Sequence, residues 1–434
     1  MNMSTPTFAS VDITPSKPAA LAGYAARSGS YSGVAEPLEA NLMIARSPDG
    51  EPAVFCAIDT LFVDDALRHL VAKQAQMAPE NLIFVASHTH NGPALSDATP
   101  GLGKMCPAYF DLVAGRLARE IRSAASGGGA TTTVSCAETD GRYAVNRRRR
   151  AWVFDYQKLK RERSFSFSRR IALAANPRGV SDNRLRVWKF TGSTGAAQAV
   201  LWSLAAHPAF YPHSEMVSAD FPGTVRALVR ASLGRDIPML FCPGLAGSAI
   251  PDIPSSLPRS GKEWFMRLLP FFPVLPAFTV RSYDDYCRRV ANDIIELLDK
   301  TSAGSPVESV TISNDRTLPI FTDISGDELD VCVSSISFGE TRVVVMSGEP
   351  VGEWQDRLGI DPSILVTGYG SGRPLYVPTP EQLPDGGYEV VGFQKPFGFN
   401  GVFEPDLDRR LQEALDRVLP AGRPAPSDEP ETHP

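Results

Sequence analysis

The stretch NLIFVASHTHNGPAL, residues 81–95, joins an apolar run to two histidines separated by one residue. Its first part, NLIFVAS (81–87), has the length and composition of a buried β-strand. Because side chains alternate along an extended chain, His88 and His90 can face the same side. The whole chain has only six histidines in 434 residues. Two of them at one strand end predict either a structural pair or part of a functional site.

Similar apolar runs recur along the chain and alternate with segments of helical pattern. We expect further strands at 53–59, 197–206, 237–244 and 341–348, and helices at 64–77, 107–124 and 223–232. Strands separated by helices of this length predict an α/β fold with mixed β-sheets flanked by helices. Each strand runs into a polar or glycine-rich loop, which is where α/β proteins place their ligands.

The composition limits the functional class. Hydrophobic residues make up 43% and charged residues 21%, as in ordinary globular proteins. A net charge of -6 and a pI near 5.6 argue against nucleic acid as a partner. We see no secretion signal, no apolar run long enough to span a membrane and no Cys-x-x-Cys pair among the six cysteines. These features predict a cytoplasmic protein without a transmembrane segment.

A second strand end also carries a histidine. WSLAAHPAFYPHSEMVSADFPG (202–223) runs an apolar strand into His207, whereas His213 is expected at the surface. Carboxylates follow other strands, namely Asp59, Asp220 and Glu349. Each carboxylate alone fits a helix-capping or turn role. Taken together, neutral imidazoles and a carboxylate at several strand ends are typical of a zinc site.

Seven motifs extend this pattern: DITP (12–15), GYAAR (23–27), SHTHNGP (87–93), VNRR (145–148), HPAFYPHSEMVSADFPG (207–223), SGEPVGEW (347–354) and LYVPTPEQ (375–382). In these motifs and their order the chain resembles the N-terminal catalytic domain of the neutral/alkaline (non-lysosomal) ceramidases and their shorter bacterial relatives. The resemblance implies one ceramidase-like catalytic domain over residues 1–420. It also implies a single catalytic zinc, held by His88, His207, Glu349 and Tyr376.

The resemblance further implies that His90 and Arg147 lie beside the metal and steady a polarised carbonyl or oxyanion. Asp220 and Asp59 join His90 as candidates for proton transfer, and Asp59 is also a candidate for a position beyond the ligands or in a second metal site. We expect substrate contacts from Tyr24, Asn91 and Gly244. Two departures are expected to matter. Gly244 stands where true ceramidases carry a serine near the zinc, and the C-terminal immunoglobulin-like domain is absent.

These observations favour a zinc-dependent hydrolase that uses metal-activated water on an amide (N-acyl or lactam) or a related ester, and not on ceramide itself. Its substrate would be a small molecule, anionic or acylated. One alternative is a binuclear hydrolase in which Asp59, His90 and Asp220 hold a second ion. Another is a zinc Lewis-acid enzyme for isomerisation, elimination or cyclisation. A non-catalytic binding protein is the third.

Two segments are expected to be insertions, 147–170 and 255–282. The first is strongly basic and predicts either a solvated loop or an anion-binding flap over the site. Within the second, residues 264–280 are apolar but interrupted by three prolines, which exclude a continuous helix. This part fits a substrate gate, a contact in a homo-oligomer or a covering loop. The tail, 421–434, has the composition of a disordered end.

Overall fold

The structure is a computed structural model of the chain. It describes residues 5–125, 131–154, 156–256, 275, 277–301, 304–358, 361 and 363–419. The predicted disordered tail, 421–434, and most of the apolar segment 264–280 lie outside the described residues.

The larger sheet of the described chain has eight strands. Their order is β1 (Thr7–Asp12), β3 (Glu39–Arg46), β4 (Pro52–Ile58), β5 (Leu82–Ala86), β21 (Ile364–Gly370), β19 (Thr341–Ser347), β18 (Cys332–Phe338) and β15 (Val310–Arg316). β4 pairs with β5, and β19 with β21, in parallel, whereas the other neighbours are antiparallel. The sheet is therefore mixed, as the sequence predicts.

A second sheet packs face to face on the first. It has five strands in the described chain, in the order β12 (Met239–Cys242), β10 (Ala197–Ser203), β9 (Arg184–Gly192), β6 (Thr132–Asp140) and β14 (Ser305–Pro306). Side chains from both sheets share one apolar core that includes Phe55, Trp188 and Leu201. Phe190 joins the sheets directly, with its ring centroid 4.7 Å from that of Phe8 and 5.4 Å from that of Phe338.

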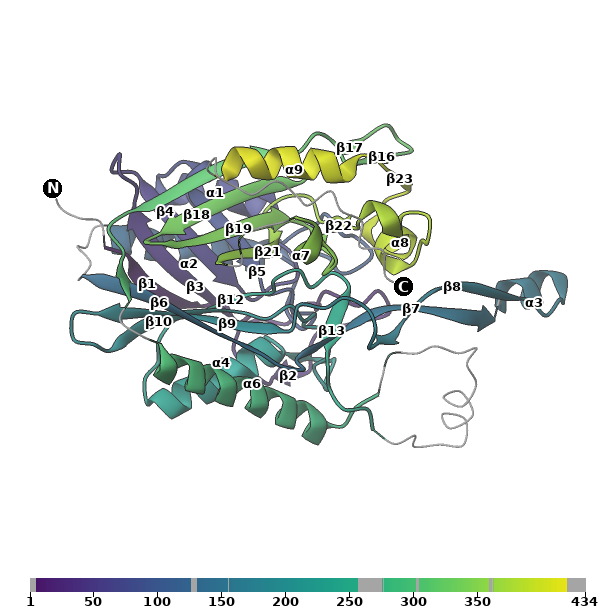
Figure 1. Cartoon of the computed structure of the whole chain (residues 1–434), viewed down its shortest axis with the longest axis horizontal. Coiled ribbons are helices and arrows are strands. Elements are labelled where there is room, and N and C mark those ends of the chain that lie inside the picture. Colours follow the sequence, from purple (N-terminus) through teal and green to yellow (C-terminus); the bar gives the residue numbers. More distant parts are fainter. Residues whose placement is uncertain are drawn as a thin grey trace, which may run out of the picture.

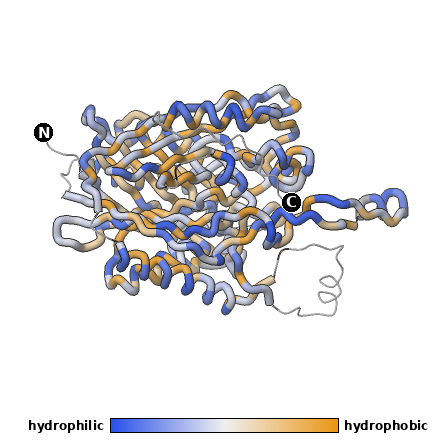
Figure 2. Tube along the Cα trace, in the orientation of Figure 1, coloured by the Kyte–Doolittle hydropathy of each residue, from blue (hydrophilic) through white to orange (hydrophobic). Residues whose placement is uncertain are grey.

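Helices cover the outer face of each sheet and make a four-layer α/β arrangement (Figure 1). α1 (Asp65–Ala75), α2 (Pro107–Ala125) and α9 (Leu407–Val418) pack on the larger sheet. α4 (Phe221–Leu233) and α6 (Val280–Lys300) pack on the smaller one. Figure 2 shows the hydrophobic residues concentrated in the strands between these helical layers. Within the described chain, every helix is too short or too polar to span a lipid bilayer.

Short elements complete the described chain. The paired strands are β13 (Ala249–Pro251), β7 (Ala144–Phe154) and β8 (Phe167–Asn176); β20 (Glu349–Pro350) and β22 (Tyr376–Val377); β11 (Met216–Val217) and β2 (Gly33–Val34); and β17 (Glu328–Leu329), β16 (Phe321–Asp323) and β23 (Gly401–Phe403). The short helices are η1 (Pro79–Asn81), α3 (Tyr156–Glu162), α7 (Trp354–Arg357), η2 (Pro380–Gln382), η3 (Tyr388–Gly392) and α8 (Gln394–Phe397).

The basic segment 147–170 is neither the predicted loop nor a flap over the site. It forms a hairpin of β7 and β8 joined by α3, and this hairpin projects from the body of the molecule (Figure 1). The prediction failed because the arginines of these two strands give the segment the composition of a solvated loop. Arg147 and Arg148 at its root are buried.

Strand ends from both sheets meet at one place. β5 and β19 lie on either side of β21 and run in opposite directions. Their carboxyl ends lie close together, because Gly370 of β21 pairs with both Val85 of β5 and Ser347 of β19. β10, in the smaller sheet, ends four residues before His207. The meeting point brings His88, His207 and Glu349 together.

Candidate metal centre

His88 follows β5 in a backbone conformation that few non-glycine residues adopt, with φ at +65°. This turn buries the ring, leaving the residue 2% exposed. The Nδ1 atom lies 2.9 Å from the carbonyl oxygen of Leu61. Because a carbonyl can only accept, Nδ1 carries the proton and Nε2 presents a lone pair. Burial lowers the pKa of His88 to about 3, so the ring is neutral.

His207 is held in the same manner on the loop after β10. Its backbone N–H donates to the carbonyl oxygen of Ala249, and its Nδ1 lies 3.4 Å from the carbonyl oxygen of Ala246. Burial also holds the pKa of His207 well below its ordinary value. Its Nε2 lies 3.0 Å from Nε2 of His88. Two neutral imidazoles therefore direct lone pairs at one point.

His90 completes a group of three buried or half-buried imidazoles with ligand atoms within 4.8 Å of one another. Its Nε2 lies 3.4 Å from Nε2 of His88. The backbone of Gly23 fits closely against the ring, since a Cβ atom on Gly23 would lie 2.6 Å from it. The ring of Tyr24 packs beside it, with 4.9 Å between centroids. Nδ1 of His90 is buried and has no hydrogen-bond partner among the described residues.

Glu349 supplies a carboxylate to the same point. It begins β20, directly after β19 and the left-handed Gly348. Its Oε2 lies 3.4 Å from Nε2 of His88 and 3.8 Å from Nε2 of His207. This oxygen is buried and accepts no hydrogen bond from the described residues. Burial raises the pKa of Glu349 to about 8, against the lowering effect of a hydrogen bond from Tyr376.

Tyr376 lies beside Glu349 because β22 pairs with β20 in parallel. Nη2 of Arg147 donates to its hydroxyl oxygen at 2.8 Å. Arg147 is itself fixed by Glu389, whose Oε1 accepts from Nε at 2.9 Å. The second oxygen of Glu389 accepts from Nη1 of Arg148 at 2.7 Å. One buried carboxylate thus orients two buried arginines, of which Arg147 faces the site.

The donor set fits a zinc ion. Zinc binds imidazole nitrogen at about 2.0–2.1 Å, so two ligand atoms of a tetrahedral site lie about 3.3 Å apart. Nε2 of His88 lies 3.0 Å from Nε2 of His207, 3.4 Å from Nε2 of His90 and 3.4 Å from Oε2 of Glu349. The carboxylate oxygen without a partner and the converging lone pairs have no stabilising contact with each other. A divalent cation held by His88, His207 and Glu349 would satisfy these atoms, with Nε2 of His90 beside it.

A cavity of about 370 Å³ opens onto this cluster. Polar groups line one end, namely His88, His90, His207, Arg147, Glu349 and Tyr376. Most of the remaining wall is apolar, with Leu102, Leu173, Phe210, Ile250 and Phe397. A cavity with an apolar wall and a few convergent polar groups is typical of a small-molecule site.

Comparison with solved structures identifies the architecture. The neutral ceramidase from Pseudomonas aeruginosa superposes on this chain with a TM-score of 0.67 and 12% sequence identity, covering 95% of this chain and 73% of that one. The chain has the fold of a neutral ceramidase. A structure described as ceramidase complexed with C2 matches with a TM-score of 0.68 and 13% identity over 96% of this chain and 75% of that one. No protein-family model and no curated protein matches the sequence.

Within this ceramidase fold, two predicted carboxylates stand apart from the cluster. Asp59 is buried, and its Oδ2 accepts from Nη2 of Arg226 at 2.8 Å. Asp220 is the N-cap of α4, and its two oxygens accept from the backbone N–H groups of Phe210, Tyr211 and Phe221 and from the hydroxyl of Tyr283. Neither carboxylate lines the cavity. The geometry makes Asp220 a residue that positions the loop carrying His207.

Three residues were expected to contact substrate, and the ceramidase fold places them differently. Tyr24 lines the cavity and donates its hydroxyl proton to the carbonyl oxygen of Ala209. Asn91 is buried and does not line the cavity, and its Nδ2 donates to the carbonyl oxygens of His213 and Met216. Gly244, at φ +64°, packs on Ala205 and does not line the cavity. Only Tyr24 is therefore in a position to touch a ligand there.

Two residues that the sequence did not suggest also shape the site. Glu389 lies on η3 and is fully buried between Arg147 and Arg148. Tyr369, at φ +64°, lies with its ring centroid 4.6 Å from that of His88. A glutamate within GGYEVVG and a tyrosine within a strand carry no signal that would single them out. Their roles depend on contacts between segments far apart in the chain.

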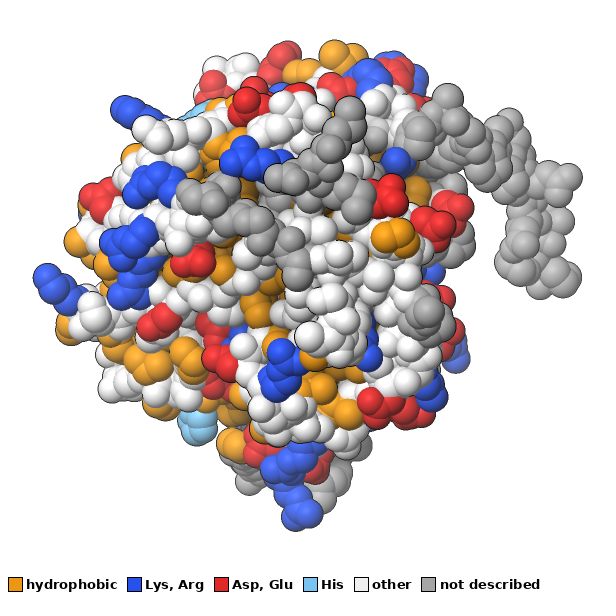
Figure 3. All heavy atoms as spheres, turned by 90° about the vertical axis from the view of Figure 1, so that its left-hand side faces the viewer, with side chains coloured by type: hydrophobic (Ala, Val, Ile, Leu, Met, Phe, Trp, Pro, Cys, Tyr) orange, Lys and Arg blue, Asp and Glu red, His pale blue; other side chains and the backbone are white. Residues whose placement is uncertain are grey.

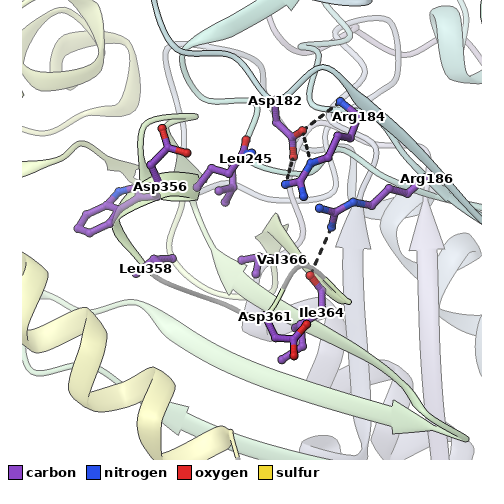
Figure 4. A pocket seen from close by; sticks show the side chains of 11 residues that line it. Asp182, Arg184, Arg186, Leu245, Asp356, Leu358, Asp361, Ile364 and Val366 are labelled. Atoms are coloured by element: carbon purple, nitrogen blue, oxygen red, sulfur yellow. Dashed lines mark hydrogen bonds and ion pairs between the residues drawn. The ribbon is translucent and has the colours of Figure 1, made fainter. Parts of the chain in front are cut away.

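A second depression, of about 220 Å³, lies away from the cluster (Figure 4). Three of its charged groups are already engaged. Asp182 accepts from Nε and Nη2 of Arg184 at 2.9 and 3.1 Å, and Nη1 of Arg186 donates to the carbonyl oxygen of Ile364 at 3.3 Å. We therefore place the candidate site at the histidine cluster.

Proposed function

We propose that this chain is a zinc-dependent hydrolase that cleaves an amide, or a related ester, of a small acylated molecule. The observation that carries the proposal is the convergence of three imidazole Nε2 atoms and a carboxylate oxygen in a cavity whose other walls are mostly apolar. His88, His207 and Glu349 would hold the metal, with Tyr376 as a further ligand. When bound, zinc supplies Lewis acidity for a carbonyl group and lowers the pKa of water.

The protein's own groups are arranged for acyl transfer. Arg147 brings a fixed positive charge to the cavity, since Glu389 and the Tyr376 hydroxyl hold its guanidinium on two sides. Such a preorganised donor stabilises an oxyanion more effectively than a mobile one. His90 stays neutral because burial lowers its pKa. Its Nε2, which lies 3.4 Å from Nε2 of His88, faces the site and can exchange a proton with the reacting groups.

The substrate class follows from the walls of the cavity. Leu173, Phe210 and Phe397 form an apolar surface suited to an alkyl or acyl portion. At the polar end, Arg147 and His90 would face the carbonyl group or the leaving group of the substrate. The structural neighbours are described as ceramidases, which supports hydrolysis of an N-acyl bond. The 12–13% identity leaves the substrate of this chain open.

A binuclear site receives no support from the described residues, because Asp59 is engaged with Arg226 and Asp220 with backbone N–H groups.

The test of the proposed hydrolysis is a panel of N-acyl amides, lactams and matched esters incubated with the protein and followed by mass spectrometry. Hydrolysis predicts products whose summed mass exceeds that of the substrate by one water, absent with His88→Ala. A product of unchanged mass would instead favour the non-hydrolytic Lewis-acid reaction.

A further inference from the structure

The hairpin formed by β7, α3 and β8 links the candidate site to a distant surface. At its root, Arg147 and Leu173 line the cavity. Its outer half extends beyond the body of the molecule, where no other described element covers it (Figure 1). A two-stranded hairpin gains little stability from its own strand pairing, so an apolar surface on its outer half calls for a further partner.

One face of this outer half is aromatic. Trp152 pairs with Arg169, and Phe154 pairs with Phe167, so alternation places these four side chains on the same face. The ring centroid of Phe154 lies 5.3 Å from that of Phe167 and 6.1 Å from that of Phe165. Trp152, Phe165 and Phe167 are nevertheless 51%, 79% and 44% exposed. We call Trp152, Phe154, Phe165 and Phe167 the aromatic face.

Positive charge surrounds the aromatic face. Residues 147–170 contain ten arginines and lysines, against Asp155 and Glu162. The inner arginines are compensated, since Arg148 pairs with Glu389 and Arg150 with Asp385. The outer ones, Arg161, Arg163, Arg169 and Arg170, are exposed. Figure 3 shows the contrast on the side of the molecule away from the hairpin, where basic and acidic side chains are interspersed.

We propose that the outer half of this hairpin docks on the surface of an anionic lipid bilayer. Tryptophan and phenylalanine favour the boundary between headgroups and acyl chains, and each nearby lysine or arginine adds attraction to anionic lipid. The aromatic face supplies the first property and the outer arginines supply the second. Because the root of the same hairpin lines the cavity, docking brings the cavity close to the lipid surface. The inference does not depend on the metal or on the reaction.

The test uses the full chain and sedimentation with vesicles of phosphatidylcholine, with and without phosphatidylglycerol. We expect binding to the anionic vesicles and weak binding to the neutral ones. Arg169→Glu with Arg170→Glu should lower the partition coefficient by about tenfold or more, because each basic residue contributes about fivefold. Arg119→Glu with Lys300→Glu, which reverses two exposed charges on α2 and α6, should leave it unchanged.

A second arm tests the aromatic face. Trp152→Ala should weaken binding severalfold, whereas Leu318→Ala is the matched control, since Leu318 is 52% exposed. The fifth tryptophan, Trp264, lies outside the described residues, so this measurement uses a Trp264→Phe background. Brominated lipid should quench its tryptophan fluorescence, and adding Trp152→Phe should remove most of that quenching, because the remaining Trp188, Trp202 and Trp354 are buried.

His88→Ala should still bind vesicles, which separates this inference from the proposed hydrolysis. Three results would overturn the proposal: no binding to any vesicle, equal binding to both kinds, or binding that the hairpin variants leave intact. Sedimentation equilibrium without lipid can give a fourth result that overturns the proposal. A dimer abolished by Trp152→Ala, together with no vesicle binding, would assign the aromatic face to a second copy of the chain.

Discussion

Nε2 of His88 lies 3.0 Å from Nε2 of His207, and a backbone carbonyl faces Nδ1 of each ring. The carbonyls fix the proton on Nδ1, so two lone pairs face each other in a buried site. Two such lone pairs repel unless a cation or a proton lies between them. Burial holds the pKa of both rings below the ordinary value, which disfavours the proton. This arrangement supports our proposal of a bound cation, because carbonyl partners orient histidine ligands in the same manner in metal sites.

Glu349 predicts how the metal-free protein responds to pH. Its pKa is raised from 4.5 to about 8, so the folded state binds its proton more tightly than the unfolded state. The stabilisation from this proton is complete below about pH 4.5 and is lost as the pH rises towards about 8. After chelation, the wild type should lose stability relative to Glu349→Gln across this window, by about 1.4 kcal/mol per pKa unit. Urea melts at several pH values measure this difference, and parallel curves for the two proteins would contradict it.

The contact between Gly23 and His90 predicts a positional effect on catalysis. A Cβ atom at residue 23 would lie 2.6 Å from the ring, so Gly23→Ala should displace His90. We expect kcat to fall by roughly 100- to 10,000-fold, the range of a lost proton-transfer group, while metal content is retained. Gly29→Ala is the control, because Gly29 also has a positive φ, +86°, but has open space where the Cβ would stand. Equal losses in the two variants would assign the effect to backbone strain.

Glu389 predicts coupled losses of stability and activity. Glu389→Gln leaves Arg147 and Arg148 buried without a compensating charge, which costs about 3–5 kcal/mol in comparable buried pairs. The loosened Arg147 should also lower kcat more than it changes KM, since an oxyanion forms only in the transition state. Glu381→Gln removes a carboxylate that is 62% exposed and pairs with Arg357, so it should cost under about 1 kcal/mol. Denaturant unfolding and steady-state kinetics would show no difference between the two variants if Glu389 had no special role.

Asp220 distinguishes a positioning residue from a catalytic base. Because its oxygens cap α4 and bind the loop at Phe210 and Tyr211, Asp220→Ala should cost at least the ~1–2 kcal/mol of a lost N-cap. It should also weaken metal retention through His207. Asp64→Ala, which removes the N-cap of α1, should cost stability alone. A large loss of kcat with unchanged stability and metal content would make Asp220 a base after all.

The sequence predicted the histidine cluster for a physical reason that the structure confirms in part. Long apolar runs before His88, His207 and Glu349 marked the ends of buried strands, and these ends do meet. They do not share one edge of a parallel sheet, however, because β5 and β19 run in opposite directions. Strand direction depends on pairing between distant segments, which local patterns do not encode.

Other features followed from contacts that a single sequence hides. Asp59 and Asp220 look the same as Glu349 in sequence, since each follows an apolar run or borders a motif. The tertiary structure alone shows that Asp59 binds Arg226 and that Asp220 accepts hydrogen bonds from four donors. The composition of 147–170 likewise suggested a solvated loop, because charge obscured the alternation of Trp152 and Phe154 along a strand.

Elemental analysis of protein purified without added metal is the decisive measurement for the proposed zinc site. We expect about one zinc per chain in the wild type and in His213→Ala, which changes an exposed histidine on the same loop as His207. We expect loss of zinc in His88→Ala and in His207→Ala. A wild-type protein that contains no metal and takes up none on zinc addition would contradict a zinc site at His88 and His207, and so would zinc that both variants retain.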